Sequence, residues 1–264
     1  MISVKTDFNQ ILDVYQSEIN QDINERLNFI RKQVEGAKAK GVVVGISGGI
    51  DSAVVAALAM RALGPDQVLG VWMPANSHPQ HAEDAKLLAA DLGFKLTTVN
   101  LDTTSNIILE AISQGLVEGD KITTEQDLSV LTKGNTKARL RMTTLYAIAG
   151  QLGYLVAGTC NRTEIYLGYE TKGGDQICDF NPVASLVKGQ IRIIAKELGV
   201  PQKIIDKAPS ADLWEGQTDE DEMGLTYEQV DTFLLTGVGD TNVKDKVQEM
   251  HQKSQHKREM PPSF

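Results

Sequence analysis

The residues that decide the fold are "GVVVGISGGIDSAVVAAL", positions 41–58. A β-branched apolar run reaches two glycines and then passes into a second apolar run with helical spacing. This order predicts a buried strand, a tight loop and a helix. A loop at the start of a helix presents backbone N–H groups at the positive end of the helix dipole. The stretch therefore predicts a site for an anion, typically a phosphate.

The side chains of the loop refine this prediction. Ser47 and Ser52 add hydroxyl donors, and Gly48 and Gly49 can take positive φ and let phosphate oxygens approach the backbone closely. Asp51 repels phosphate unless a cation lies between them, and Mg²⁺ takes carboxylate and phosphate oxygens together. The alternative is an ordinary strand-to-helix turn with a first-turn carboxylate. The complete Ser-Gly-Gly-x-Asp-Ser set favours the phosphate site.

Two familiar phosphate loops are excluded by inspection. The P-loop needs a lysine after its last glycine, but Gly49 is followed by Ile50. The dinucleotide fingerprint G-x-G-x-x-G fails because Gly45 is followed by Ile46 and Ser47. The loop resembles instead the SGGxDS pyrophosphate loop of the N-type ATP pyrophosphatases. Enzymes of that superfamily cleave ATP between its α and β phosphates to adenylate a substrate.

Length and composition bound the class of protein. A chain of 264 residues with 41% hydrophobic residues is expected to form one α/β domain over 1–264, with a core at about 41–200 and a C-terminal loop and helices at about 201–264. Runs of eighteen apolar residues and a signal-peptide h-region are both lacking, so no membrane partner and a cytoplasmic location are expected. Cys160 and Cys178 are too few for a disulfide framework. The net charge of −9 disfavours a nucleic-acid partner.

Apolar strand candidates alternate with helical patterns along the chain. The strands are expected at 41–46, 67–73, 95–101 and 154–158, and the helices at about 50–63, 79–92, 103–114 and 136–152. This alternation predicts a parallel sheet flanked by helices on both faces. Ligands of such sheets bind beyond the carboxyl ends of the strands, where 47–52 lies. The acidic stretch 210–224 is rich in helix breakers and is the candidate for a lid over the site.

A second strand-to-loop junction is "YLVAGTCNRTEIYLGYETKGGDQICDFNP", positions 154–182. Its strand is expected to end at Gly158 and Thr159, and a helix to open at about Asn161. The loop that follows holds a mixed-charge set with two adjacent glycines; its members are Glu164, Lys172, Asp175 and Asp179. A solvated loop explains the charges but not the glycines. By itself, this stretch leaves both interpretations open.

Five motifs occur in a fixed order, and together they carry a resemblance. They are "SGGIDS", "GNTKAR" (134–139), "GTCNRTE" (158–164), "TKGGD" with Asp179 (171–179) and "HKREMP" (256–261). The chain resembles the ammonia-dependent NAD synthetases over nearly its whole length. The resemblance implies an adenine nucleotide alpha hydrolase-like fold. It also implies the ATP-dependent amidation of deamido-NAD to NAD through an adenylated intermediate, with release of AMP and pyrophosphate.

The resemblance also implies roles for individual residues. The ATP phosphates would be held by Gly45, Ile46, Ser47, Gly48, Gly49, Ile50, Asp51 and Ser52, and the ATP site completed by Thr159, Lys188 and Ser210. Magnesium would bind Asp51 and Glu164. Deamido-NAD would contact Arg139, Lys172, Asp179, His256 and Lys257, and ammonia would enter near Asp175. Of these residues, Asp51, Lys188 and Asp175 would carry the chemistry.

Ordinary structural interpretations stand beside some of these roles. Arg139 can lie on the wet face of an amphipathic helix, Lys188 can be a solvated charge, and 256–257 can belong to a frayed tail. The order of the motifs favours the functional interpretation of each. At Ser210 the family more often has threonine, so a hydroxyl is retained. Cys160 is expected to be structural, because adenylation needs no thiol nucleophile.

The nitrogen source and the partners follow from the same resemblance. Free ammonia is expected, because the chain leaves no room for a glutaminase domain, and a homodimer is implied with deamido-NAD bound across its interface. The nearest alternatives are another SGGxDS pyrophosphatase, of the tRNA-thiolating or GMP synthetase type, and a regulator that binds ATP without turnover. Acidic charge and the lack of a C-x-x-C pair disfavour thiolation. Asp51 and Glu164 disfavour the regulator, because binding ATP without turnover needs no pair of metal-binding carboxylates.

Overall fold

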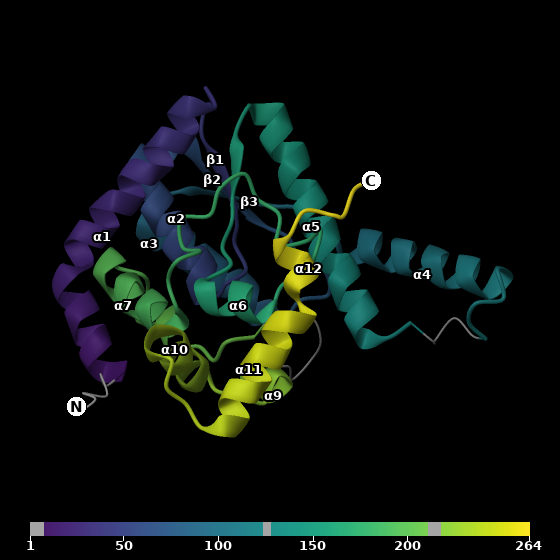
Figure 1. Ribbon diagram of the computed structural model, residues 1–264. Coiled ribbons are helices and arrows are strands. Elements are labelled where there is room, and N and C mark those ends of the chain that lie inside the picture. The colour runs from purple at the N-terminus through teal and green to yellow at the C-terminus, as the bar shows by residue number, and fades with distance from the viewer. Residues whose placement is uncertain (1–7, 124–127, 211–217) are drawn as a thin grey trace.

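A four-stranded parallel sheet lies at the centre of the computed structural model, which describes residues 8–123, 128–210 and 218–264 (Figure 1). Its strands are β1 (Val42–Gly45), β2 (Val68–Trp72), β3 (Lys95–Thr98) and β4 (Leu155–Ala157), in the order β3-β2-β1-β4. Val42, Val43 and Val44 of β1 are fully buried, since a central strand of a two-sided sheet has no exposed face. The predicted parallel sheet is confirmed. Of the predicted lid, 211–217 lies outside the described residues.

Helices cover both faces of the sheet. Val42 and Val44 point to a core formed with α1 (Phe8–Gly36), α2 (Ile50–Leu63), α3 (Pro79–Leu92) and α7 (Lys188–Leu198). Val43 points the other way, to a smaller core formed with α5 (Val130–Leu152). The alternation along β1 follows from the two-residue repeat of a strand. Helices on both faces confirm the second half of the fold prediction.

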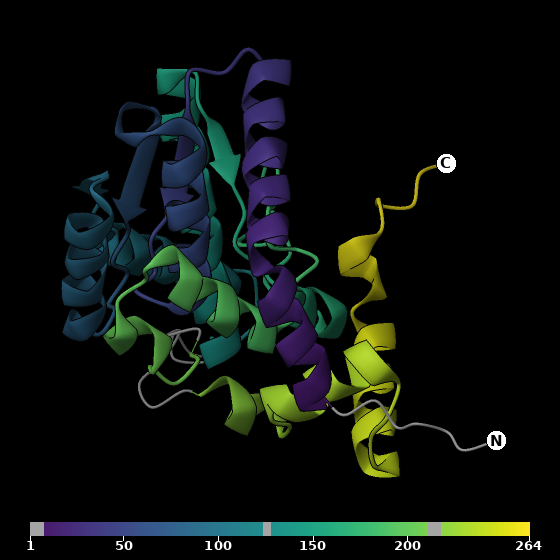
Figure 2. The ribbon, with the colours of Figure 1, turned by 90° about the vertical axis from the view of Figure 1, so that its left-hand side faces the viewer.

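Helix α1 covers one side of the sheet because its apolar residues recur on one face. Its buried residues are Ile19, Ile23, Leu27, Ile30 and Val34, a spacing of three or four that forms a single stripe. Figure 2 shows this long helix standing beside the sheet, with the C-terminal helices on the side toward which the strand arrows point. None of the helices within the described residues is long and apolar enough to span a bilayer.

Several element boundaries differ from the sequence prediction. Helix α5 begins at Val130 rather than at 136, because the Ser129 side chain caps it by accepting from the Thr132 amide. Helix α4 (Asp102–Glu118) continues beyond the predicted end at 114, and β3 ends at Thr98 rather than at 101. Helix α3 has the predicted bounds. A 3₁₀ turn, η1 (Pro65–Gln67), precedes β2.

The C-terminal part of the chain forms a layer beyond the carboxyl ends of the strands. Its helices are α8 (Gln202–Ile205), α9 (Asp219–Met223), α10 (Tyr227–Thr236), α11 (Thr241–Lys253) and α12 (Gln255–Arg258). A third core, which includes Tyr227, Val230 and Val247, joins this layer to α6 (Arg162–Leu167). Arg258 donates to the carbonyl oxygens of Ile165 and Tyr166. The end of α12 is therefore docked on the body of the protein and is not a frayed tail.

Candidate functional site

A cavity of about 480 Å³ lies where the loops after β1 and β4 meet the C-terminal layer. Most of the predicted site residues line it. They are Gly45, Ile46, Ser47, Gly49, Ile50, Asp51, Ser52, Thr159, Glu164, Asp175, Lys188, Ser210 and Lys257. Motifs that are more than a hundred residues apart in the sequence thus meet at the carboxyl edge of the sheet, as expected for a parallel sheet.

The loop 45–49 joins β1 to α2 and is held closed by its serines. The Ser52 hydroxyl accepts from the Ser47 amide at 3.2 Å and donates to the Gly49 carbonyl oxygen at 3.1 Å. The Ser47 hydroxyl lies 3.1 Å from the Ser52 hydroxyl and accepts from the Gly49 amide at 3.1 Å. These bonds fix the conformation of the loop. The serines therefore shape the loop as well as offering hydroxyl groups to a ligand.

Only one of the two glycines adopts the left-handed conformation. Gly48 has φ of 78°, and a Cβ there would lie 2.9 Å from the carbonyl oxygen of His81. Gly49, at the N-cap of α2, has φ of −102°, so only Gly48 uses the positive φ that glycine allows. Gly49 has no side chain to accept from the first-turn amides, which are the anion donors that the sequence predicts.

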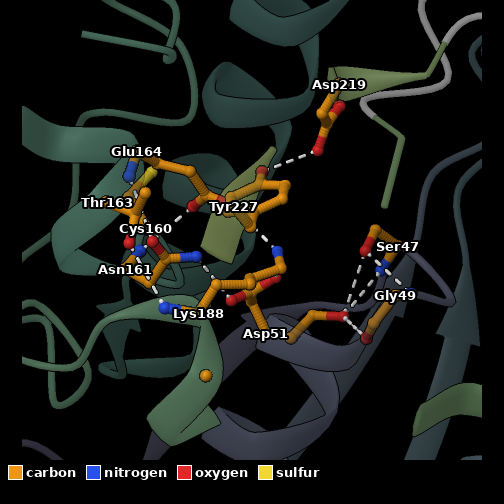
Figure 3. A network of polar contacts seen from close by, with 12 residues as sticks. Ser47, Gly49, Asp51, Cys160, Asn161, Thr163, Glu164, Lys188, Asp219 and Tyr227 are labelled. Atoms are coloured by element: carbon orange, nitrogen blue, oxygen red, sulfur yellow. Dashed lines mark hydrogen bonds and ion pairs between the residues drawn. The ribbon is translucent and has the colours of Figure 1, made fainter. Parts of the chain in front are cut away.

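Asp51, Glu164 and Lys188 form a charge cluster in the cavity wall, in which Lys188 is buried and the two carboxylates are partly buried (Figure 3). The Nζ atom of Lys188 lies 2.6 Å from Oδ2 of Asp51 and 3.1 Å from Oε1 of Glu164. Its side chain is 3% exposed. Nζ also lies over the ring of Tyr227, 4.8 Å from the ring centroid. Lys188 is therefore no solvated surface charge, and it joins the two carboxylates that the sequence assigned to Mg²⁺.

The cluster carries one negative charge in excess when all three groups are ionised. Burial raises the pKa of Glu164; Lys188 lowers it in part, and the neighbouring Asp51 raises it further. Burial lowers the pKa of Lys188, but the two carboxylates outweigh it and hold that pKa above its usual value. Burial is thus the main cause of the raised Glu164 pKa, whereas the two carboxylates are the cause of the raised Lys188 pKa.

Asn161 positions the cluster from the start of α6. Its side-chain oxygen accepts from the Glu164 amide at 3.0 Å, and Oε2 of Glu164 accepts from the Asn161 amide at 3.0 Å, which forms a capping box. Its Nδ2 donates to Oδ1 of Asp51 at 2.9 Å. The helix predicted to open near Asn161 is confirmed. The cap fixes the Glu164 carboxylate in the direction of Lys188.

Asp175 also lines the cavity, beside Cys160 and Thr171. Its Oδ1 accepts from the Thr171 amide at 2.8 Å, and the Cys160 thiol lies 3.8 Å from its Oδ2. Burial raises the pKa of Asp175, and hydrogen bonds from Thr171 lower it in part. Burial likewise raises the pKa of the Cys160 thiol well above its usual value, and the Asp175 charge adds to the rise. Cys160 is therefore a poor source of thiolate at neutral pH.

The residues expected to contact deamido-NAD divide into two groups. Lys257 lines the cavity and donates to the carbonyl oxygens of Gly168 at 2.7 Å and Glu170 at 2.5 Å. Arg139, Lys172 and His256 lie outside the cavity wall and form a chain. In it Nε of Arg139 donates to the Lys172 carbonyl oxygen at 3.1 Å, and Nζ of Lys172 donates to the His256 carbonyl oxygen at 2.6 Å.

Asp179 also lies outside the cavity wall, and its carboxylate has structural partners. Oδ2 accepts from the Val156 amide of β4 at 2.7 Å, and Oδ1 accepts from the Tyr146 hydroxyl at 3.2 Å. Asp179 thus ties the segment after the TKGGD motif to the sheet. The sequence motif alone did not indicate this contact.

Asp219 and Lys207 line the cavity and Tyr227 lies behind its wall, but none of the three belongs to a sequence motif. The Tyr227 hydroxyl donates to Oδ2 of Asp219 at 2.8 Å, and both residues are buried. Lys207 lies against the phosphate loop and is paired with Asp84 of α3. An aromatic residue or a lysine without neighbouring motif residues gives no sequence signal. These contacts require the tertiary structure.

Comparisons with known proteins show which sequences and structures this chain resembles. A family model described as NAD synthase matches residues 22–261. A curated NH(3)-dependent NAD(+) synthetase from Carboxydothermus hydrogenoformans is 48% identical over 89% of this chain and 93% of its own length. The structure of NMN synthetase from Francisella tularensis has a TM-score of 0.85 and 36% identity, covering 93% of this chain and 98% of that one. An NH3-dependent NAD synthetase from Campylobacter jejuni has a TM-score of 0.73 and 33% identity, with coverage of 93% and 98%.

Proposed function

Because this chain belongs to the NAD synthase family, a family of ligases that form a C–N bond, we propose that it converts deamido-NAD to NAD with ammonia and ATP. A carboxylate oxygen of the nicotinate ring attacks the α-phosphorus of ATP. The bond to the bridging oxygen breaks, and its electron pair leaves with pyrophosphate. Ammonia then attacks the carbonyl carbon, the C–O bond to AMP breaks, and the nitrogen loses one proton.

One observation carries the proposal: the loop after β1 and the cap of α6 place two carboxylates around Lys188 beside a phosphate-type loop. Neither a sensor nor an ordinary strand-to-helix turn needs this arrangement. In the proposal the amides and hydroxyls of 45–52 hold the ATP phosphates, and Thr159 and Ser210 contribute from the opposite wall. Such fixed donors stabilise the charge that develops on the leaving pyrophosphate.

Magnesium fits the donor set of the cluster. Asp51 and Glu164 present carboxylate oxygens, the cluster attracts positive charge, and Lys188 occupies the position between them. Mg²⁺ characteristically binds one or two carboxylates together with substrate phosphates and water. The described residues contain no group of three or more side chains that could hold a metal ion. In the proposal, an ion bound here takes part of its ligand shell from ATP. The ion would neutralise the leaving pyrophosphate.

The part of the cavity around Asp175 is the proposed entry point of ammonia. The Asp175 carboxylate lines the cavity and accepts a hydrogen bond from the Thr171 amide, so it can accept an ammonium ion and orient the nitrogen after the proton is lost. The neutral Cys160 thiol beside it contributes packing and a weak donor. Deamido-NAD would contact Lys257 in the cavity wall and four residues outside that wall. The four are Arg139, Lys172, Asp179 and His256.

A homodimer is the proposed assembly. Helix α4 extends away from the body of the protein next to α5 (Figure 1), and only Ser105 and Ser113 of this helix are buried. Exposed apolar residues lie on α4 and on the start of α5; they are Ile107, Ile108, Ile112, Val130 and Leu131. A cluster of this kind marks an interaction surface. Leu131 also lines the cavity, so a second copy bound here would lie close to the substrate.

Pyrophosphate release and NAD formation by the purified full chain test the proposal. Both products should require deamido-NAD, Mg²⁺ and ammonium together, and glutamine should not replace ammonium. Pyrophosphate release without deamido-NAD would favour another SGGxDS pyrophosphatase. ATP binding without turnover would favour a regulator. Sedimentation at several protein concentrations tests the dimer. A cytoplasmic location is part of the same proposal, and the free thiols of Cys160 and Cys178 support it.

A mononucleotide substrate is the second candidate, because the structure with a TM-score of 0.85 is that of an NMN synthetase. The chemistry at the nicotinate carboxylate would be the same. The two substrates differ in the adenylyl half, which the cavity residues named above do not distinguish. Parallel measurement of kcat/KM for deamido-NAD and for nicotinic acid mononucleotide separates the two, and we expect the dinucleotide to be preferred.

A further inference from the structure

We propose that Lys207 is a second phosphate-binding cation of the ATP site and that Asp84 positions it; this inference rests on the function proposed above. Lys207 follows α8 and lines the cavity. Its Nζ donates to the Gly48 carbonyl oxygen at 3.2 Å and to Oδ2 of Asp84 at 2.8 Å. The ammonium group therefore lies against the loop that is proposed to hold the phosphates, on a side chain that is 25% exposed.

Asp84 is a buried carboxylate whose partners fix the position of Lys207. The residue is 1% exposed, and its oxygens accept from Lys203 at 2.9 Å, from Lys207 at 2.8 Å and from Gln80 at 3.0 Å. A buried carboxylate needs such partners because desolvation of an unpaired charge is costly. Lys203 supplies the same kind of ion pair as Lys207, but it does not line the cavity.

The same helix holds the loop at a second point. Nδ1 of His81 lies 3.1 Å from the Ser47 carbonyl oxygen, and Gly48 packs against the backbone of His81. Helix α3 thus carries both Asp84 and the contacts to the loop. Lys207 is fixed relative to the loop by a rigid element, which is the condition for a preorganised charge.

The charges around the cavity give a reason for a second cation. Lys188 is committed to two carboxylates. Among the other lining cations in the described part of the chain, Arg141 donates to Met73 and Ser77, and Lys257 donates to Gly168 and Glu170. Both contact other walls of the cavity. Lys207 contacts a backbone carbonyl of the phosphate loop itself, so it adds positive charge where pyrophosphate would leave.

Three variants separate a phosphate contact from structural support. Lys207→Gln keeps a donor for the Gly48 carbonyl oxygen but removes the charge, Lys207→Arg keeps the charge, and Lys203→Gln removes the other ion pair of Asp84. In Lys207→Gln we expect the KM for ATP and the inhibition constant of pyrophosphate to rise about tenfold or more, the size of one charge-assisted hydrogen bond. The KM for deamido-NAD should change by less than about twofold, because the hydrogen bond that is lost is one to ATP. Lys207→Arg, which keeps the charge, should lose less than Lys207→Gln, and Lys203→Gln should stay near wild type.

The role of Asp84 is tested with Asp84→Asn and with the double variant. Asp84→Asn should raise the KM for ATP, and adding Lys207→Gln should give less than the sum of the two single effects, because both act through one contact. Wild-type values for ATP and pyrophosphate in Lys207→Gln would overturn the inference. Equal losses in Lys203→Gln and Lys207→Gln would also overturn it, since both would then only neutralise Asp84. Failure of the wild-type chain to form NAD would instead refute the proposed function.

Discussion

The side-chain amide of Asn161 donates to the carboxylate of Asp51 across 110 positions of the sequence, with 2.9 Å between Nδ2 and Oδ1. The other end of the same amide caps α6 by accepting from the Glu164 amide. One fully buried side chain thus fixes both carboxylates of the charge cluster. The GTCNRTE motif is connected to the SGGIDS motif by this contact, and the spacing of the two carboxylates depends on it.

Replacing Asn161 by alanine should impair both stability and activity. The change removes a cap and leaves the Asp51 oxygen and the Glu164 amide without a partner. Loss of a cap and of a buried hydrogen bond costs about 1–3 kcal/mol. Urea unfolding measures that loss, and the rate of pyrophosphate release should fall by at least about tenfold because the carboxylates lose their spacing.

Ser129→Ala is the matched control for Asn161→Ala. Ser129 also caps a helix, α5, by accepting from a backbone amide, but it does not contact the cluster. It should lose stability of roughly 0.5–2 kcal/mol with little change in turnover. If Asn161→Ala and Ser129→Ala lost the same activity for a given loss of stability, Asn161 would act only as a helix cap.

Lys188→Met should slow adenylation more than it weakens the binding of deamido-NAD. The methionine keeps most of the volume but leaves Asp51 and Glu164 facing each other without the ammonium, which costs up to about 3–5 kcal/mol for a buried pair. Mg²⁺ should raise the melting temperature of this variant more than that of wild type, because the ion replaces the missing charge. Lys86→Met, which removes an exposed pair with Glu83, is the control. A variant with unchanged pyrophosphate release would remove Lys188 from the chemistry.

The central sheet was predictable because periodicity carries strong information there. The run 41–46 is apolar throughout and the run 67–73 is apolar after Gln67, as strands buried on both faces must be, and the glycine-rich loop fixes where β1 ends. The C-terminal layer was predicted only as a loop and helices. Helices α8, α9 and α12 have four or five residues each, too short for a periodic pattern.

Within the site, motif residues were predictable and their partners were not. The sequence located Asp51, Glu164 and Lys188, but a sequence pattern does not state that Lys188 lies between the other two. It also did not reveal Lys207 and Asp84, which are separated by 123 positions. Such pairs arise from the packing of α3 against the segment after α8, and no local propensity encodes that contact.

The ion pairs of Asp84 predict a dependence of stability on pH. Burial raises the pKa of Asp84, but the hydrogen bonds from Lys207, Lys203 and Gln80 outweigh it and hold the pKa below its usual value of 3.8. A lowered folded-state pKa gives stability that is present above the unfolded value and lost as pH falls through the folded value. Asp84→Asn should therefore be less stable than wild type at neutral pH by about 1.5–3 kcal/mol. The difference should shrink as pH falls below about 3.8.

Urea unfolding of both chains at neutral pH and at several acidic values measures the effect of Asp84. Lys203→Gln serves as the comparison, because it removes one of the two ion pairs and should lose a smaller part of the same stability. A constant difference between wild type and Asp84→Asn over the whole acid range would show that the charge of Asp84 contributes nothing.

Asp51→Asn tests why a carboxylate lies inside a phosphate loop. Asparagine keeps the size of the side chain and an oxygen that accepts from Asn161, but it removes the charge that faces Lys188. If Asp51 and Glu164 share a magnesium ion with ATP, the loss of one anionic ligand weakens the neutralisation of the leaving pyrophosphate. Activity should then fall by roughly a hundredfold or more, since each 1.4 kcal/mol is tenfold.

The magnesium dependence distinguishes this role from a structural one. In Asp51→Asn and in Glu164→Gln part of the lost activity should return at high Mg²⁺, because binding of the ion is what has been weakened. If Asp51 only favoured the dipole of α2, the change would cost about 1 kcal/mol of stability at most and leave turnover nearly intact. Asp66→Asn, at an exposed aspartate, is the control for loss of a surface charge. A variant of Asp51 that melts earlier yet amidates at the wild-type rate, with the wild-type Mg²⁺ dependence, would exclude the metal role.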